Sequence, residues 1–181
     1  MKHFLLPGTL LALGMSLLGA QPTKITNLTQ YGVKVRYLDF KWDEEAFEAL
    51  EKGGNTPKAQ RSWAIARLFP SKPMILNGKQ VLAGNLLILN PARGDRPMTL
   101  EVRVIDMRDF YKDETTNVIA EPPAGQTIYI EAADFKKVDT LAERMTFGLS
   151  EGDGTIKLSI HYGDRMAIME FDRSADRIER H

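Results

Sequence analysis

Histidine is the side chain best suited to proton transfer near neutral pH, and two histidines follow the first twenty residues, His161 and the terminal His181. The segment 155–162 alternates apolar and polar residues, which places His161 on one face with Lys157 and Ser159. A serine–histidine pair needs its hydroxyl within about 3 Å of the imidazole. Residues two apart on a strand are separated by about 6.6 Å. We therefore expect His161 to face solvent, as a candidate for a ligand surface and not as a catalytic base.

Carboxylates of the segment 105–123 could in principle support glycoside hydrolysis, which needs two of them about 5 Å or 6.5–9.5 Å apart. The acidic residues concerned are Asp106, Asp109, Asp113 and Glu114. Nothing in their spacing places two of them across a cleft, and the turn 151–154 lacks the spaced acidic positions of a calcium loop. The sequence therefore predicts no catalytic residue, no metal site and no cofactor.

Trp63 and Arg67 are the other two candidates for a ligand surface. Alternation along the apolar run 62–69 places both on one strand face, together with Ile65. Aromatic rings stack on sugars and peptides, and the aromatic residues suited to this role are Trp63, Phe110, Tyr111 and Tyr129. Core packing or loop anchoring is the alternative role for these rings, and a charge at the rim of a surface is the alternative for Arg67.

Composition excludes several classes of function. The chain has no cysteine, which rules out thiol catalysis, iron–sulfur clusters and thiolate zinc sites. It has 24 Lys plus Arg and 24 Asp plus Glu, so no nucleic acid or anionic membrane is indicated as a partner. A domain without disulfides must be held together by apolar burial and backbone hydrogen bonds.

Residues 1–20 have the pattern of a secretory signal peptide, with a basic start, an apolar run over 4–18 and small residues before Gln21. The apolar run is shorter than the roughly 20 residues that span a bilayer. Gln21 also stands where a bacterial lipoprotein requires cysteine. We therefore expect cleavage after Ala20 and a soluble protein that is exported to the periplasm or beyond, with no membrane insertion.

The rest of the chain reads as a single β-rich domain over 21–172, followed by a charged tail over 173–181. Period-two alternation, interrupted by turn residues, predicts most of its strands. The expected strands are 33–37, 62–69, 74–76, 80–82, 86–89, 99–104, 127–131, 145–149, 155–162 and 165–171. The segment 99–104 has one face of alternating charge. This pattern predicts a mostly β protein, an antiparallel β-sandwich or a partly open barrel.

One α-helix is expected over residues 44–52. Asp43 is placed to cap it, and Gly53 follows its end. Trp42 and Phe47 have the spacing of a hydrophobic staple, in which the residue before the cap packs on the first turn.

Turn residues predict three tight hairpins, at Asn77-Gly78, at 151–154 and at Gly163-Asp164. The segment 134–143 resembles a capping box, which favours a short turn or helix before the next strand. Residues 109–123 have no sustained period and form a long connection.

The stretch 75–89, ILNGKQVLAGNLLIL, resembles the core pattern of a bacterial exported family known as domain of unknown function 2911. The shared pattern is a strand, an Asn-Gly turn, a short strand, Ala-Gly and another apolar strand. The closing strands 145–149, 156–162 and 165–171 follow in a similar order. This family has no established activity, so the resemblance implies an exported β fold and no catalytic residue.

These observations predict a non-enzymatic binding or interaction module of the cell envelope, whose partner is a small ligand, a glycan or an envelope protein. One alternative is an envelope hydrolase that uses dispersed carboxylates and possibly His161. The other is a barrel that encloses a small apolar ligand, which requires an interior cavity of several hundred Å³.

Overall fold

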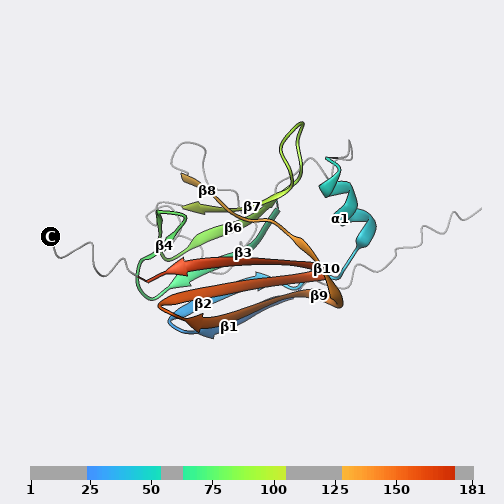
Figure 1. Ribbon diagram of the computed structural model, residues 1–181. Helices are drawn as coiled ribbons and strands as arrows, with labels where there is room; N and C mark the ends of the chain where they lie inside the picture. The colour runs from blue at the N-terminus through green and yellow to red at the C-terminus, as the bar shows by residue number, and fades with distance from the viewer. Residues whose placement is uncertain (1–23, 54–62, 105–127, 174–181) are drawn as a thin grey trace, which may run out of the picture.

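The computed structural model describes residues 24–53, 63–104 and 128–173, which form two antiparallel sheets and one helix (Figure 1). The six-stranded sheet has the order β1 (Ile25–Gln30), β2 (Val33–Leu38), β3 (Trp63–Pro70), β6 (Asn85–Asn90), β7 (Thr99–Val104) and β8 (Ile128–Ala133). The four-stranded sheet has the order β5 (Lys79–Val81), β4 (Met74–Leu76), β10 (Thr155–Asp172) and β9 (Lys136–Gly152). The predicted sandwich is confirmed, and the sheets do not close into a barrel.

The core lies between the two sheets and is built by the period-two pattern. In β2, Val33, Val35 and Tyr37 are buried while Lys34 is exposed. The ring of Tyr37 meets that of Phe147 from β9 at a centroid distance of 4.4 Å. One apolar cluster contains residues of both sheets, so burial of one sheet depends on the other.

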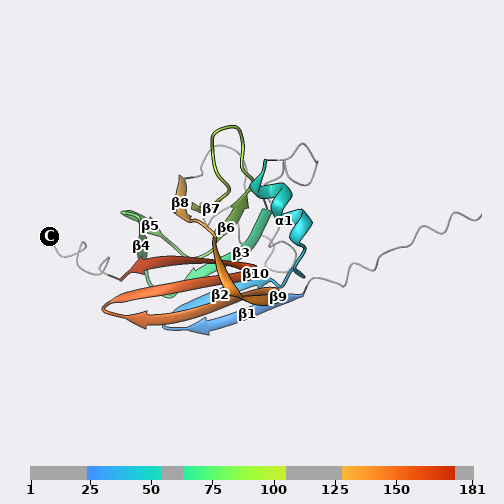
Figure 2. The ribbon, with the colours of Figure 1, turned by 45° about the vertical axis from the view of Figure 1, so that its right-hand side comes forward.

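The predicted helix is confirmed as α1 (Glu44–Glu51), which lies at the end of the molecule opposite the β4–β5 hairpin (Figure 2). The Asp43 carboxylate accepts a hydrogen bond from the backbone N–H of Ala46 at 2.9 Å. The predicted staple also forms, because the rings of Trp42 and Phe47 are 5.3 Å apart. Phe47 is buried and joins the helix to the core.

Two of the three predicted hairpins are confirmed. Asn77-Gly78 has φ values of 49° and 74°, and Asp153-Gly154 has 52° and 77°. Successive positive φ angles give the turn a twist that matches that of the strands it joins. Asn, Asp and Gly are the residues that adopt this conformation most readily.

The third prediction is wrong, because β10 continues through Gly163-Asp164 without turning. The register with β9 shifts on both sides of Gly163, whose φ is 64°, as in a β-bulge. A Cβ atom on Gly163 would lie 2.1 Å from Cδ2 of Trp42. The glycine therefore admits the indole ring against the strand, a contact that local sequence does not reveal.

The helix or turn expected over 134–143 is also wrong, since β9 begins at Lys136 and runs to Gly152. Lys136 pairs with Met166 and Lys137 with Arg165. Further along β9, the N–H of Met145 donates to the carbonyl of Phe40 at 2.8 Å, which ties β9 to the chain that leaves β2. Long-range pairing thus makes a strand of a segment that has no alternating pattern.

A register shift in β3 changes the predicted placement of Trp63. Before the shift Trp63 lies opposite Leu89, and after it Arg67 lies opposite Leu86. Leu89 faces the core between the sheets, whereas Leu86 belongs to a separate cluster on the outer face. Trp63 and Arg67 therefore occupy opposite faces of β3, because a one-residue bulge reverses the alternation.

The predicted signal peptide 1–20, the predicted connection 109–123 with the carboxylates considered for glycoside hydrolysis, and most of the predicted tail lie outside the described residues. Arg173, the first residue of the predicted tail, is described and makes an ion pair with Glu151 at 2.5 Å.

Candidate functional site

The three residues singled out from the sequence lie on three different surfaces. Trp63 packs on the core, 6.1 Å from the ring of Phe40. Arg67 lies on the outer face of the six-stranded sheet. His161 lies on the outer face of the other sheet, where its Nε2 is 3.2 Å from the carbonyl oxygen of Thr140. The structure therefore brings none of the three together.

Strand register places three arginines in one row across the outer face of the six-stranded sheet. Arg36 lies opposite Arg67, Arg67 opposite Leu86, and Leu86 opposite Arg103. Directly opposed residues of antiparallel strands project from the same face. We call Arg36, Arg67 and Arg103 the arginine row.

The arginine row is partly buried. Arg67 is only 7% exposed, and this burial, together with the charge of Arg36, lowers the pKa of its guanidinium. Within the described residues, the Nε atoms of all three arginines are buried and have no hydrogen-bond partner, although each side chain makes other interactions. Leu86 and Ile88 are buried on the same face.

Two hollows with volumes of about 610 and 370 Å³ lie beside β7 and β8, and the larger one is also lined by Asn77 and Lys79 of the β4–β5 hairpin. Both are lined by Arg96, Glu101 and Glu131, and we call the two together the polar groove. Its other lining residues are Asn77, Lys79, Asn90, Pro91, Arg93, Pro97, Thr99, Arg103, Ile130 and Asp134. Arg103 belongs both to this groove and to the arginine row.

The polar groove offers hydrogen-bond donors and acceptors side by side. Glu101 of β7 lies directly opposite Glu131 of β8, and two like charges in such a position repel each other. Arginine and lysine side chains also line the groove, so it contains both carboxylates and cations. This arrangement suits a ligand that carries both hydroxyl groups and an anionic group.

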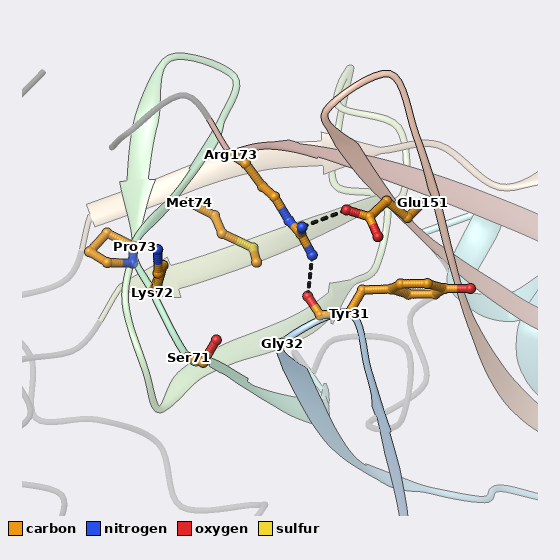
Figure 3. Close-up of a pocket in the computed structure, with 8 residues that line it drawn as sticks. All are labelled: Tyr31, Gly32, Ser71, Lys72, Pro73, Met74, Glu151 and Arg173. Carbon is orange, nitrogen blue, oxygen red and sulfur yellow. Dashed lines mark hydrogen bonds and ion pairs between the residues drawn. The ribbon is translucent and has the colours of Figure 1, made fainter. Parts of the chain in front are cut away.

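A second concavity, the end pocket, lies where hairpins of the two sheets meet (Figure 3). Its volume is about 450 Å³, and it shares no lining residue with the polar groove. Its lining residues are Tyr31, Gly32, Ser71, Lys72, Pro73, Met74, Glu151 and Arg173. The guanidinium of Arg173 extends between the hairpins, where it pairs with Glu151 and donates to the carbonyl of Tyr31.

The sequence pattern indicates one strand of the polar groove but not the groove itself. The alternating charges of 99–104 are a correct signal, since Glu101 and Arg103 both line it. Glu131 follows thirty residues after Glu101, and only the pairing of β7 with β8 brings the two together. No sequence pattern indicates the end pocket, because its residues come from four separate turns and strand ends.

No group of three or more side chains suited to metal binding occurs among the described residues. In the same part of the chain, no helix is long and apolar enough to cross a membrane. Comparisons with known protein families, curated proteins and solved structures find no match. The resemblance to the exported family therefore stays a prediction.

Proposed function

We propose that this protein is an exported binding module of the cell envelope and that its polar groove binds an acidic saccharide. The observation that carries the proposal is that both hollows share Arg96, Glu101 and Glu131, so the same cation and carboxylates line both of them. Sugar hydroxyls both donate and accept hydrogen bonds, and the acid group of such a sugar pairs with a guanidinium in a bidentate way. The signal-peptide pattern of residues 1–20 supports the location.

Calorimetric titration with tetragalacturonic acid, and with the neutral galactose tetramer, tests this proposal. We expect the acidic oligomer to bind more tightly, and its affinity to fall with added salt. Arg96→Gln and Glu131→Gln are each expected to weaken binding about tenfold or more, the usual effect of losing a charged hydrogen bond. Lys157→Gln, on the outer face of the other sheet, is the matched control. Equal affinity for the acidic and neutral oligomers in all variants would contradict the proposal.

The facing carboxylates favour a second candidate, an envelope glycosidase. Directly opposed residues on antiparallel strands have Cβ atoms about 4.5–5.5 Å apart. The carboxyl groups lie two bonds beyond these Cβ atoms, within reach of the roughly 5–5.5 Å that separates the carboxyl groups of retaining glycosidases. Glu101 and Glu131 would then be the acid–base and nucleophile pair, and His161 would have no role because it lies on the other sheet.

Chromogenic glycosides of uronic acids separate the two candidates. A glycosidase predicts turnover that both Glu101→Gln and Glu131→Gln abolish and that His161→Ala leaves unchanged. Binding of the acidic oligomer without turnover supports the binding module instead.

A further inference from the structure

We propose that the end pocket is a second ligand site and that it takes a small organic carboxylate with an apolar body. The site is separate from the polar groove, and the proposal does not depend on the function proposed for that groove. At about 450 Å³ the pocket lies in the range of ordinary small-molecule sites and is far larger than a lone ion requires.

Two contacts hold the guanidinium of Arg173 in a fixed position. One terminal nitrogen of Arg173 pairs with the Glu151 carboxylate at 2.5 Å, and the other donates to the backbone carbonyl of Tyr31. These two contacts come from different sheets and hold the guanidinium between them (Figure 3). A guanidinium has five N–H donors, so Arg173 keeps donors for a ligand while its orientation is set in advance.

The side chains that line the end pocket carry charges of both signs. Among the lining residues, Arg173 and Lys72 are cationic and Glu151 is anionic. The Ser71 hydroxyl adds a neutral donor on the same side as Lys72. One carboxylate offers acceptors to the Arg173, Lys72 and Ser71 donors.

A close approach of Gly32 to Ser71 places the Ser71 hydroxyl at the end pocket. The N–H of Ser71 donates to the carbonyl of Gly32 at 2.7 Å, which joins the β1–β2 turn to the chain after β3. A Cβ atom on Gly32 would lie 2.7 Å from Oγ of Ser71. Glycine at position 32 therefore lets the hydroxyl sit at the pocket wall.

Part of the lining of the end pocket is apolar. Met74 is 4% exposed, and Figure 3 shows its thioether directed toward the guanidinium of Arg173. Pro73 provides a second apolar surface beside it. A thioether adapts to ligands of different shape and contacts aromatic rings favourably. The pocket thus combines cationic donors with adjoining apolar surface, as an organic acid requires.

The test follows the methyl signal of Met74 by NMR while phenylacetate is titrated into the mature protein. Two compounds serve as controls. Acetate has the carboxylate without the phenyl ring, and 2-phenylethanol has the phenyl ring without the carboxylate. We expect a saturable shift with phenylacetate and affinities at least tenfold weaker for both controls. A shift of equal size and midpoint with 2-phenylethanol would overturn the proposal.

Variants then assign the binding to the pocket. Arg173→Gln and Lys72→Gln are each expected to weaken phenylacetate binding about tenfold. Lys72→Gln leaves the Arg173 contacts in place, so it reports on charge even if Arg173→Gln loosens the hairpins. Lys137→Gln, whose ion pair with Asp164 lies outside the pocket, is the matched control. Unchanged binding in Lys72→Gln and in a folded Arg173→Gln would contradict the assignment.

Discussion

At the scale of single residues, Gly163 leaves no room for a side chain. Its φ of 64° is strained for other residues, and a Cβ there would meet the Trp42 indole. We expect Gly163→Ala to lower the free energy of unfolding by about 3 kcal/mol, from backbone strain together with overpacking. Urea denaturation measures this loss.

Gly154 provides the matched control for that substitution. Its φ is 77°, and a Cβ added there meets nothing within 4 Å. Gly154→Ala should therefore lower the free energy of unfolding through backbone strain alone, by about 1 kcal/mol. Equal losses in the two variants would mean that the Trp42 contact contributes nothing.

Tyr31 is a bulky residue at a left-handed position, with a φ of 52°. The corresponding positions of the other two tight turns hold Asn77 and Asp153, which tolerate this conformation better. We expect Tyr31→Asn to raise the free energy of unfolding by about 1 kcal/mol, because the turn is no longer strained. The converse change, Asp153→Tyr, should destabilise by a similar amount in the same denaturation assay. A stabilising Asp153→Tyr would show that turn strain does not decide the effect.

Tyr162 makes stability fall at high pH. Burial, with a smaller contribution from the charge of Asp43, raises the pKa of its phenol to about 12, and its hydroxyl donates to the carbonyl of Lys41 at 2.9 Å. The unfolded chain releases this proton near pH 10, whereas the folded chain keeps it until about pH 12. The stabilisation is therefore complete below pH 10 and is lost as the pH rises to about 12.

The substitution Tyr162→Phe tests this dependence. The variant should lose about 1 kcal/mol at neutral pH, since the Lys41 carbonyl loses its donor. Between pH 10 and 12 its stability should fall less steeply than that of the unmodified protein. Denaturation curves at several pH values give both quantities, and parallel slopes would contradict the prediction.

At the scale of elements, an ion pair joins the end of β2 to β9. Arg144 donates from Nε and from one terminal nitrogen to the two oxygens of Asp39, each at 3.1 Å. The hydrogen bond to Arg144 is the largest cause of the lowered pKa of Asp39, and the backbone N–H of Lys24 adds to it. A lowered folded-state pKa stabilises the protein above the unfolded value of 3.8, and this stability is lost as the pH falls through the folded value.

We expect Asp39→Asn to lower the free energy of unfolding by about 1 kcal/mol at neutral pH. The difference from the unmodified protein should disappear in acid, below the depressed pKa of Asp39, because both chains are then neutral at this position. Glu170→Gln is the control, since its ion pair with Lys157 is about half exposed on both sides and should contribute little. A difference for Asp39→Asn that persists in acid would assign the effect to packing.

Elements set by local chemistry were predictable from the sequence, and those set by pairing were not. The Asp43 cap, the Trp42–Phe47 staple and the Asn77-Gly78 turn act within a few residues, and all three form. Gly163-Asp164 carries the same turn signal, but the Trp42 indole and the pairing with β9 make it a bulge.

For the candidate site, the sequence predicts which residues of one strand share a face, but not how the strands align. Alternation placed Arg103 on a polar face correctly, but its alignment with Arg67 depends on the register of three strands. Alternation also placed Trp63 beside Arg67, and one extra residue in β3 reverses that. Sequence periodicity therefore identifies which residues can face outward, and strand register decides which of them meet.

At the scale of the whole molecule, the two sheets depend on each other. The chain passes from β3 in the larger sheet to β4 in the smaller, and returns through β6. Both sheets contribute to one apolar cluster, and backbone hydrogen bonds at Trp42 and Met145 join β9 to the segment after β2. Unfolding one sheet would expose the apolar face of the other, so we expect one cooperative unit.

Native-state hydrogen exchange tests this cooperativity with a pair of matched cavities. Leu68 of β3 and Leu158 of β10 are both almost fully buried, one in each sheet. Leucine to alanine should cost about 3 kcal/mol at either site. If the sandwich opens as one unit, each substitution should lower the opening free energy of the most protected amides equally in both sheets. Leu158→Ala should affect β6 as much as β9, and Leu68→Ala should do the same. Loss of protection confined to the substituted sheet would instead show that the connections through β9 do not couple the layers.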